Sequence, residues 1–272
     1  MLSKSKYCAF SQCPKRLWLQ TYRPEPAEDN TAPDARMETG NEVGDLAMGL
    51  FGDFTEVTAH KDGRLDLPKM IEHTKQLVAE NHPVICEASF SYEGNYCAVD
   101  ILRRENGGYA IYEVKSATHE AEIYGIDIAY QKYVLEHCGI TVTGTYLVCI
   151  NSDYVRGEEL DIQQLFKIID MSDWVEPETP LVPGKIKHAE ETLAQKNEPA
   201  QDIAERCEEP YHCPFWKYCS QHLPEHSVFD LYRLPKKKKF DFLPQGYYFL
   251  CRCHGNSSFE RCAAEANSIP AF

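Results

Sequence analysis

The sequence predicts a mixed α/β fold, in which a central sheet is flanked by helices. Two observations carry this prediction. Three apolar, β-rich runs follow one another at 84–115, and the turns between them contain glycine, as is typical of hairpin-connected strands. A helical pattern at 124–139 then precedes a further β-rich run at 141–155. A strand–strand–strand–helix–strand order with helices before it indicates a mixed sheet with a crossover helix.

The N-terminal part of the chain predicts helices. Residues 1–22 are expected to form one or two short helices, because Leu17, Trp18 and Leu19 are apolar and Pro14 suits a helix start. The acid- and proline-rich stretch RPEPAEDNTAPDA predicts a loop. Two further helices are expected at 36–51 and 68–81, where apolar residues recur at roughly helical spacing.

The elements that follow begin with the three strands, expected at 84–92, 95–103 and 109–115. The helix after them is expected to end at Gly139, because glycine commonly terminates helices. After the fourth strand, the stretch VPGKIKHAEETLAQ predicts another helix.

Composition limits the classes of function. With 272 residues, of which 43% are hydrophobic, the chain can bury a sizeable core. A net charge of −14 argues against nonspecific coating of nucleic acid, although an enzyme with a locally basic groove is compatible with it. No apolar run approaches the roughly 20 residues of a membrane helix, and no signal-peptide core is present. We therefore expect a cytoplasmic protein without a membrane partner.

Charged residues converge at the end of one predicted hairpin. Glu113 and Lys115 lie two apart and share one face of their strand, whereas Val114 faces the core. Asp100 lies on the preceding strand, opposite a position near residues 110–114. Convergent carboxylates suit Mg²⁺ or Mn²⁺, with the Val114 carbonyl as a further candidate ligand, and a lysine stabilises charge on a phosphoryl oxygen. This combination predicts metal-assisted phosphodiester hydrolysis, and a strand-end salt bridge is the alternative.

Asp100, the Glu113–Lys115 triplet and Gln131 in AYQKYVL together form a D…E-x-K…Q pattern. This pattern resembles the PD-(D/E)xK nucleases, and most closely the RecB-like branch with its CRISPR-associated exonucleases. The resemblance implies a restriction-endonuclease-like fold and a Mg²⁺- or Mn²⁺-dependent nuclease acting on DNA that is single-stranded or has free ends. It implies that Asp100 and Glu113 bind the metal, that Lys115 assists catalysis, and that Gln131 and Tyr133 line the site.

The sequence departs from this branch on an early helix. Members carry a histidine ligand in a G-x-x-x-H motif, whereas the matching stretch here, GNEVG, has Gly44 in that place. Glu42 on the same helix and Glu87 on the strand before Asp100 are candidate replacement ligands. The departure leaves a second hypothesis open, in which the chain is a catalytically degenerate nuclease fold that binds nucleic acid or acts as a metal-stapled scaffold.

Four cysteines suggest a second metal centre. Cys207, Cys213 and Cys219 are evenly spaced, and Cys13 lies in the polar segment SQCPKR. Without a secretion signal, such thiols indicate metal ligation rather than disulfides, and their type suits zinc or an iron–sulfur cluster equally.

The iron–sulfur members of the RecB-like branch take one cysteine before the nuclease core and three after it. The resemblance therefore implies a 4Fe–4S cluster on Cys13, Cys207, Cys213 and Cys219 that joins the N-terminal segment to a C-terminal helical segment, with zinc as the alternative. CEEPYHCPFWKYC also resembles bacterial proteins of unknown function that add a C-terminal domain to a RecB-like domain.

The expected domains follow from these resemblances. A nuclease domain is expected at 1–228, with its core at about 36–155 and cluster segments at 1–22 and 203–222. Residues 229–272 lack sustained periodicity and are expected to form a loosely held tail, a truncated remnant of a second domain.

Overall fold

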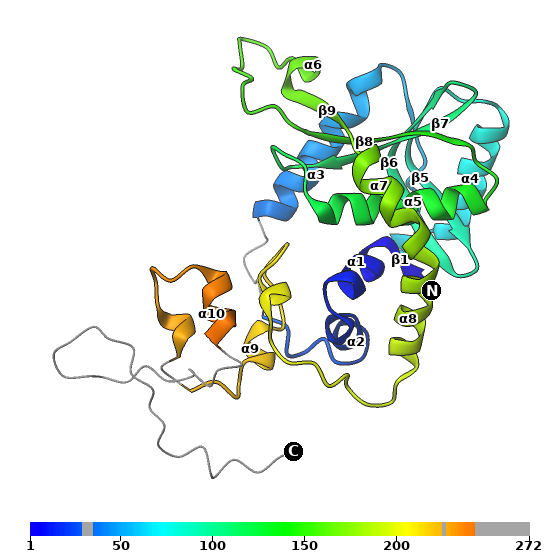
Figure 1. Ribbon diagram of the computed structural model, residues 1–272. Coiled ribbons are helices and arrows are strands. Elements are labelled where there is room, and N and C mark those ends of the chain that lie inside the picture. Colours follow the sequence, from blue (N-terminus) through cyan, green and yellow to red (C-terminus); the bar gives the residue numbers. More distant parts are fainter. Residues whose placement is uncertain (29–34, 225–226, 243–272) are drawn as a thin grey trace. The chain divides into compact units, whose positions relative to one another are not determined.

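The computed structural model describes residues 1–28, 35–224 and 227–242 (Figure 1). The chain divides into two compact units, one of residues 1–22 and 29–199 and the other of residues 23–28 and 200–272. The first unit ends at Pro199, and the expected domain boundary after residue 228 stays a prediction.

The first unit is built on a mixed sheet with the strand order β2-β5-β6-β7-β8-β9, and β1 lies beside β6. Its strands are β1 (Leu2–Ser3), β2 (Thr55–Glu56), β5 (Val84–Tyr92), β6 (Asn95–Glu105), β7 (Gly108–Lys115), β8 (Val142–Ile150) and β9 (Phe166–Asp170). The pairs β5–β6, β6–β7 and β8–β9 are antiparallel, whereas β1–β6, β2–β5 and β7–β8 are parallel. The expected mixed sheet is confirmed.

Helices before, between and after the strands complete the first unit. They are α1 (Lys4–Gln12), α2 (Pro14–Tyr22), α3 (Ala35–Met48), α4 (Leu67–Ala79), α5 (Glu122–His137), α6 (Ile162–Leu165), α7 (Ser172–Glu178) and α8 (Val182–Ala194). Short 3₁₀ turns, η1 (Gly49–Phe51) and η2 (Thr179–Leu181), continue α3 and α7, and a small hairpin pairs β3 (His60–Lys61) with β4 (Arg64–Leu65). No helix within the described ranges is long and apolar enough to cross a membrane.

Apolar side chains form a core on each face of the sheet. One core joins strand residues such as Ile111 to buried residues of α5, including Ile128 and Leu135, and to residues of α1, α2, α7 and α8. The other core joins Val114 and its neighbours to α3, η1 and α6. Helix α5 links the parallel strands β7 and β8, as the predicted crossover requires. In Figure 1, α3 and α5 accordingly lie on opposite sides of the strands.

The second unit contains short elements, namely η3 (Glu205–Cys207), α9 (Trp216–Cys219), η4 (Val228–Asp230) and α10 (Lys236–Phe242). Trp216, Phe229 and Phe240 form an aromatic cluster with ring centroids 5.0–6.0 Å apart. Within the loosely held tail expected from residue 229, residues 229–242 include part of η4 and the whole of α10, and the buried Phe240 ring holds α10 against Trp216 and Phe229. Residues 243–272, the rest of the expected tail, lie outside the described residues.

Candidate functional site

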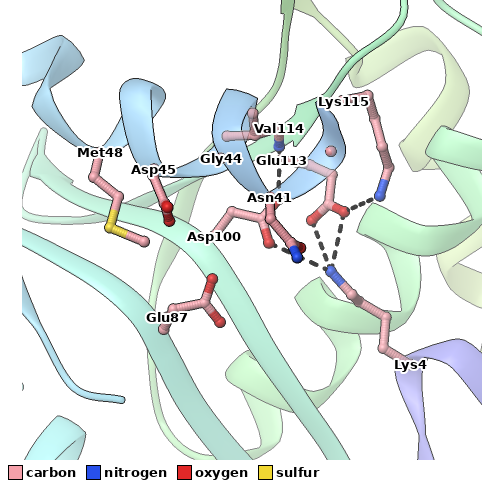
Figure 2. Close-up of a pocket in the computed structure, with 11 residues that line it drawn as sticks. Lys4, Asn41, Gly44, Asp45, Met48, Glu87, Asp100, Glu113, Val114 and Lys115 are labelled. Carbon is pink, nitrogen blue, oxygen red and sulfur yellow. Dashed lines mark hydrogen bonds and ion pairs between the residues drawn. The ribbon is translucent and has the colours of Figure 1, made fainter. Parts of the chain in front are cut away.

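A cavity of about 280 Å³ lies in the first unit, beside the strands β5, β6 and β7 and the helices α1 and α3. Polar and charged side chains dominate its wall (Figure 2). The residues that line it are Lys4, Gly40, Asn41, Gly44, Asp45, Met48, Glu87, Asp100, Glu113, Val114 and Lys115.

Three carboxylates form a row across adjacent strands of the sheet. Glu87 lies between Cys86 and Ala88, which pair with Ile101 and Val99 on either side of Asp100. Glu113 follows Tyr112, whose partner on β6 is Ile101, the residue next to Asp100. Glu87 has a left-handed backbone with φ of 55°, which is rare for a residue other than glycine and is often found at functional sites. The fold thus concentrates negative charge at one place in the sheet.

Glu113 is completely buried and is surrounded by hydrogen-bond donors. Lys4 Nζ lies 3.0 Å and 3.1 Å from its two oxygens, Gln131 Nε2 donates to Oε2 at 2.7 Å, and Lys115 Nζ donates to Oε1. Burial alone would raise the pKa of this carboxyl, but the ammonium groups of Lys115 and Lys4 outweigh it and hold the pKa far below its ordinary range. Glu113 is therefore ionised.

Asp100 is held by the neighbouring strand. The backbone N–H of Val114 donates to Asp100 Oδ2 at 2.7 Å, and Lys4 Nζ lies 3.7 Å from Oδ1. Burial and the nearby charge of Glu113 raise the pKa of the Asp100 carboxyl. Its side chain is 24% exposed, whereas that of Glu113, which also lines the cavity, is fully buried.

Asp127 is a site residue that the motif did not identify. It lies on α5 one turn before Gln131, whose Nε2 donates to Asp127 Oδ1 at 3.1 Å, and its Oδ2 lies 3.2 Å from Lys115 Nζ. Burial and the charge of Glu113 raise the pKa of Asp127 to about 6. Its spacing of four residues from Gln131 on one helix was the available signal. The contacts make Asp127 a positioning residue for Lys115.

Lys4 was also missed. It enters the site from the first turn of α1, and its ammonium lies between Glu113 and Asp100 (Figure 2). Burial alone would lower the pKa of Lys4, but the carboxylates of Asp100, Asp127 and Glu113 outweigh it and raise the pKa well above its ordinary value. Lys4 therefore stays protonated and places a positive charge among the carboxylates of the site.

The structure brings most of the predicted residues together. Asp100, Glu113, Val114, Lys115 and Glu87 all line the cavity. Gln131 contacts one of these residues, because its Nε2 donates a hydrogen bond to Glu113.

Two predicted residues are not brought to the cavity. The ring centroid of Tyr133 lies 4.1 Å from that of His137 and 6.4 Å from that of Tyr92. Tyr133 follows Gln131 by two residues on α5, and side chains two apart on a helix point in different directions. Glu42 is exposed on α3 and is not a lining residue, whereas Asp45 of the same helix is. Figure 2 shows the Asp45 carboxylate turned toward those of Glu87 and Asp100.

The carboxylates fit a cation. The Lys4 ammonium lies within 4.0 Å of Glu113, Asp100 and Asp127, so these groups already converge on one positive charge. Oxygen donors of this kind suit Mg²⁺ and Mn²⁺. An ideal Cβ built on Gly44 of α3 would have no neighbouring atom within 4 Å. In the described ranges, no group of three or more His, Cys, Asp or Glu side chains is already arranged as a metal site.

The predicted cysteine ligands belong to different units. Cys13 precedes α2 in the first unit, whereas Cys207, Cys213 and Cys219 lie in the second unit. Cys207 and Cys213 are buried, and the Cys213 N–H donates to the Cys207 carbonyl at 2.7 Å. This bond places Cys207 and Cys213 near each other within the second unit.

The site makes the stability of the metal-free protein depend on pH. Burial and the nearby charge of Asp100 raise the pKa of Glu87 from 4.5 to about 7. Between pH 4.5 and about pH 7, the Glu87 carboxyl is therefore protonated in the folded protein and ionised in the unfolded chain. We expect the thermal midpoint in EDTA to fall as pH rises through this window, and Asp127 to contribute in the same direction below about pH 6. Thermal unfolding followed by circular dichroism measures the effect.

The control for this prediction is a pair of variants. Glu87→Gln should flatten the fall, whereas Glu72→Gln, on the exposed face of α4, should retain it. Identical pH profiles for Glu87→Gln and the unaltered protein would contradict the prediction.

Comparisons with known proteins add little to this geometry. No protein-family model and no curated protein matches the chain. Among solved structures, the chain is similar to one titled "Crystal structure of SSO0001", with a TM-score of 0.42 and 14% sequence identity over 82% of this chain and 87% of that chain. A similarity this low identifies neither a family nor a function for the chain.

Proposed function

We propose that the chain is a divalent-metal-dependent nuclease that hydrolyses phosphodiester bonds in DNA, single-stranded or with free ends. The proposal includes a restriction-endonuclease-like fold of the RecB-like type, in keeping with the motif resemblance. One observation supports it most strongly. Asp100, Glu113 and Lys115 lie side by side on β6 and β7 at one cavity, and Gln131 of α5 binds Glu113. A strand-end salt bridge between Glu113 and Lys115 alone would not require these additional polar partners.

The residues have distinct roles in this proposal. Asp100, Glu113 and the carbonyl of Val114 would hold Mg²⁺ or Mn²⁺, which supplies Lewis-acid polarisation of a phosphoryl oxygen. Gln131 and the Val114 N–H fix the orientation of the two carboxylates. Lys115, held by Glu113 and Asp127, places a positive charge where charge develops on the phosphate in the transition state.

The experiment that tests the function is metal-dependent degradation of single-stranded DNA. Lys115→Ala is expected to lower the rate roughly 10²–10³-fold, because one preorganised charge is lost from the site. Lys132→Ala is the matched control, since this lysine lies on α5 and pairs only with Glu136 of its own helix at 3.9 Å among the described contacts. Equal rates for both variants and the unaltered protein would contradict the assignment, as would degradation that persists in EDTA.

We further propose that Cys13, Cys207, Cys213 and Cys219 bind a 4Fe–4S cluster. The support is the arrangement of one early cysteine and three late ones, together with the burial of Cys207 and Cys213. Thiolates also suit zinc. Metal analysis of protein purified without oxygen distinguishes the two, and a zinc content without iron would contradict the cluster.

A catalytically degenerate nucleic-acid-binding protein is the second candidate. Two observations favour it, namely Gly44 in place of a ligand and the Lys4 ammonium between the proposed metal ligands. DNA binding without cleavage in Mg²⁺ and in Mn²⁺ would support this candidate over the nuclease.

A further inference from the structure

The two residues before Lys4 are anchored to the sheet and to α5 by several contacts. Leu2 and Ser3 form β1, which pairs in parallel with the start of β6, the strand that carries Asp100. The Leu2 carbonyl accepts a hydrogen bond from the buried Tyr130 hydroxyl at 2.8 Å, and the Ser3 side chain caps α1. The first residue of α1 is thereby directed at the acidic cluster.

The ammonium of Lys4 contacts the groups that would hold the metal. Both oxygens of Glu113 lie within 3.1 Å of Nζ, Asp100 Oδ1 lies at 3.7 Å and Asp127 Oδ1 at 4.0 Å. A Mg²⁺ ion bound to the same Glu113 oxygens at its usual distance of about 2.1 Å would be close to the Lys4 ammonium, and the two positive charges would repel each other. The ammonium and the metal ion therefore compete for the same carboxylates.

We propose that Lys4 is a tethered cation that neutralises the carboxylates of the metal-free protein and that a divalent ion must displace. The inference rests on the proposed function only in that Asp100 and Glu113 bind such an ion. The Lys4 side chain has room to move, because it is 22% exposed and lines the cavity. Lys4 thereby lowers the affinity for metal and keeps the buried Glu113 paired when metal is absent.

Mn²⁺ binding by the full chain, measured by titration calorimetry and by the spin-resonance signal of free Mn²⁺, tests the proposal. Lys4→Met removes the charge but keeps most of the stem, and it should tighten Mn²⁺ binding roughly tenfold or more, or about 1.4 kcal/mol. Lys4→Arg, which keeps the charge, should bind Mn²⁺ much as the unaltered protein does. Lys6→Met, on the same helix, is the matched control and should not change the affinity. Equal affinities for Lys4→Met and Lys4→Arg would overturn the proposal.

Thermal unfolding provides a second readout. Without metal, Lys4→Met should melt at a lower temperature than the unaltered protein, because Glu113 loses one of its two ammonium partners. Saturating Mn²⁺ should then raise the midpoint of this variant more than that of the unaltered protein, and should restore folding if the metal-free variant is unfolded. A variant that Mn²⁺ does not stabilise would overturn the proposal.

The outcomes separate this inference from the proposed function. Tighter Mn²⁺ binding by Lys4→Met without any DNA cleavage would support the inference and contradict the nuclease. DNA cleavage with Mn²⁺ affinity that is unaltered in Lys4→Met would overturn the inference alone. Absence of Mn²⁺ binding by every variant would overturn both.

Discussion

Replacing Asp100 with asparagine is expected to reduce metal-dependent DNA cleavage by roughly 10³-fold or more, because one of the two proposed carboxylate ligands loses its charge. The fold should survive this change. An asparagine oxygen can still accept the hydrogen bond from the Val114 N–H, which is 2.7 Å from Asp100 Oδ2. The measurement is the initial rate of single-stranded DNA degradation in Mn²⁺, together with the thermal midpoint of each protein.

Asp153→Asn serves as the control, because this residue is exposed on the first unit and does not line the cavity. It should retain full activity. If Asp100→Asn kept more than about a tenth of the activity while remaining folded, the role of Asp100 in metal binding would be contradicted.

Glu113→Gln is expected to have the largest effect on stability, with a loss of about 3–5 kcal/mol in the free energy of unfolding without metal. The substitution leaves the ammonium groups of Lys4 and Lys115 beside a neutral side chain in a buried place. Because the pKa of Glu113 is held below its ordinary range, the stabilisation that it provides is present above about pH 5 and is lost in acid. Urea denaturation at pH 7.5 in EDTA measures the change.

Two companion variants make this prediction specific. Glu136→Gln breaks an exposed pair with Lys132 on the same helix and should cost below about 1 kcal/mol. The double variant Lys4→Met, Glu113→Gln should be more stable than the sum of the single effects, because it removes both members of one pair. Additive effects would show that Glu113 and Lys4 do not interact in solution.

The order of strands and the central acid–lysine cluster could be predicted from sequence because their signals are local. Alternation and glycine turns mark β5, β6 and β7. The β6–β7 hairpin pairs Ile101 with Tyr112, and this pairing brings the neighbouring residues Asp100 and Glu113 to the same place in the sheet. The two-residue strands β1 and β2 have no such signal, since they depend on pairing with distant strands.

Lys4 and Asp45 were not identified as site residues, because their places in the site depend on how α1 and α3 pack against the sheet. Lys4 reaches Glu113 only because β1 pairs with β6, a contact between residues far apart in sequence. On α3, Asn41, Gly44, Asp45 and Met48 recur at helical spacing and line the cavity, which leaves Glu42 on another face. A helical projection of residues 41–48 would have indicated Asp45, rather than Glu42, as the acidic residue of α3 that faces the cavity.

Anomalous diffraction from crystals of the protein soaked with Mn²⁺ tests the central claim most directly. We expect an anomalous peak within about 2.3 Å of oxygens from both Asp100 and Glu113, with the Lys4 ammonium moved away from them. A fully occupied Lys4–Glu113 ion pair with no Mn²⁺ peak at these carboxylates would contradict the proposed metal site and the nuclease mechanism built on it.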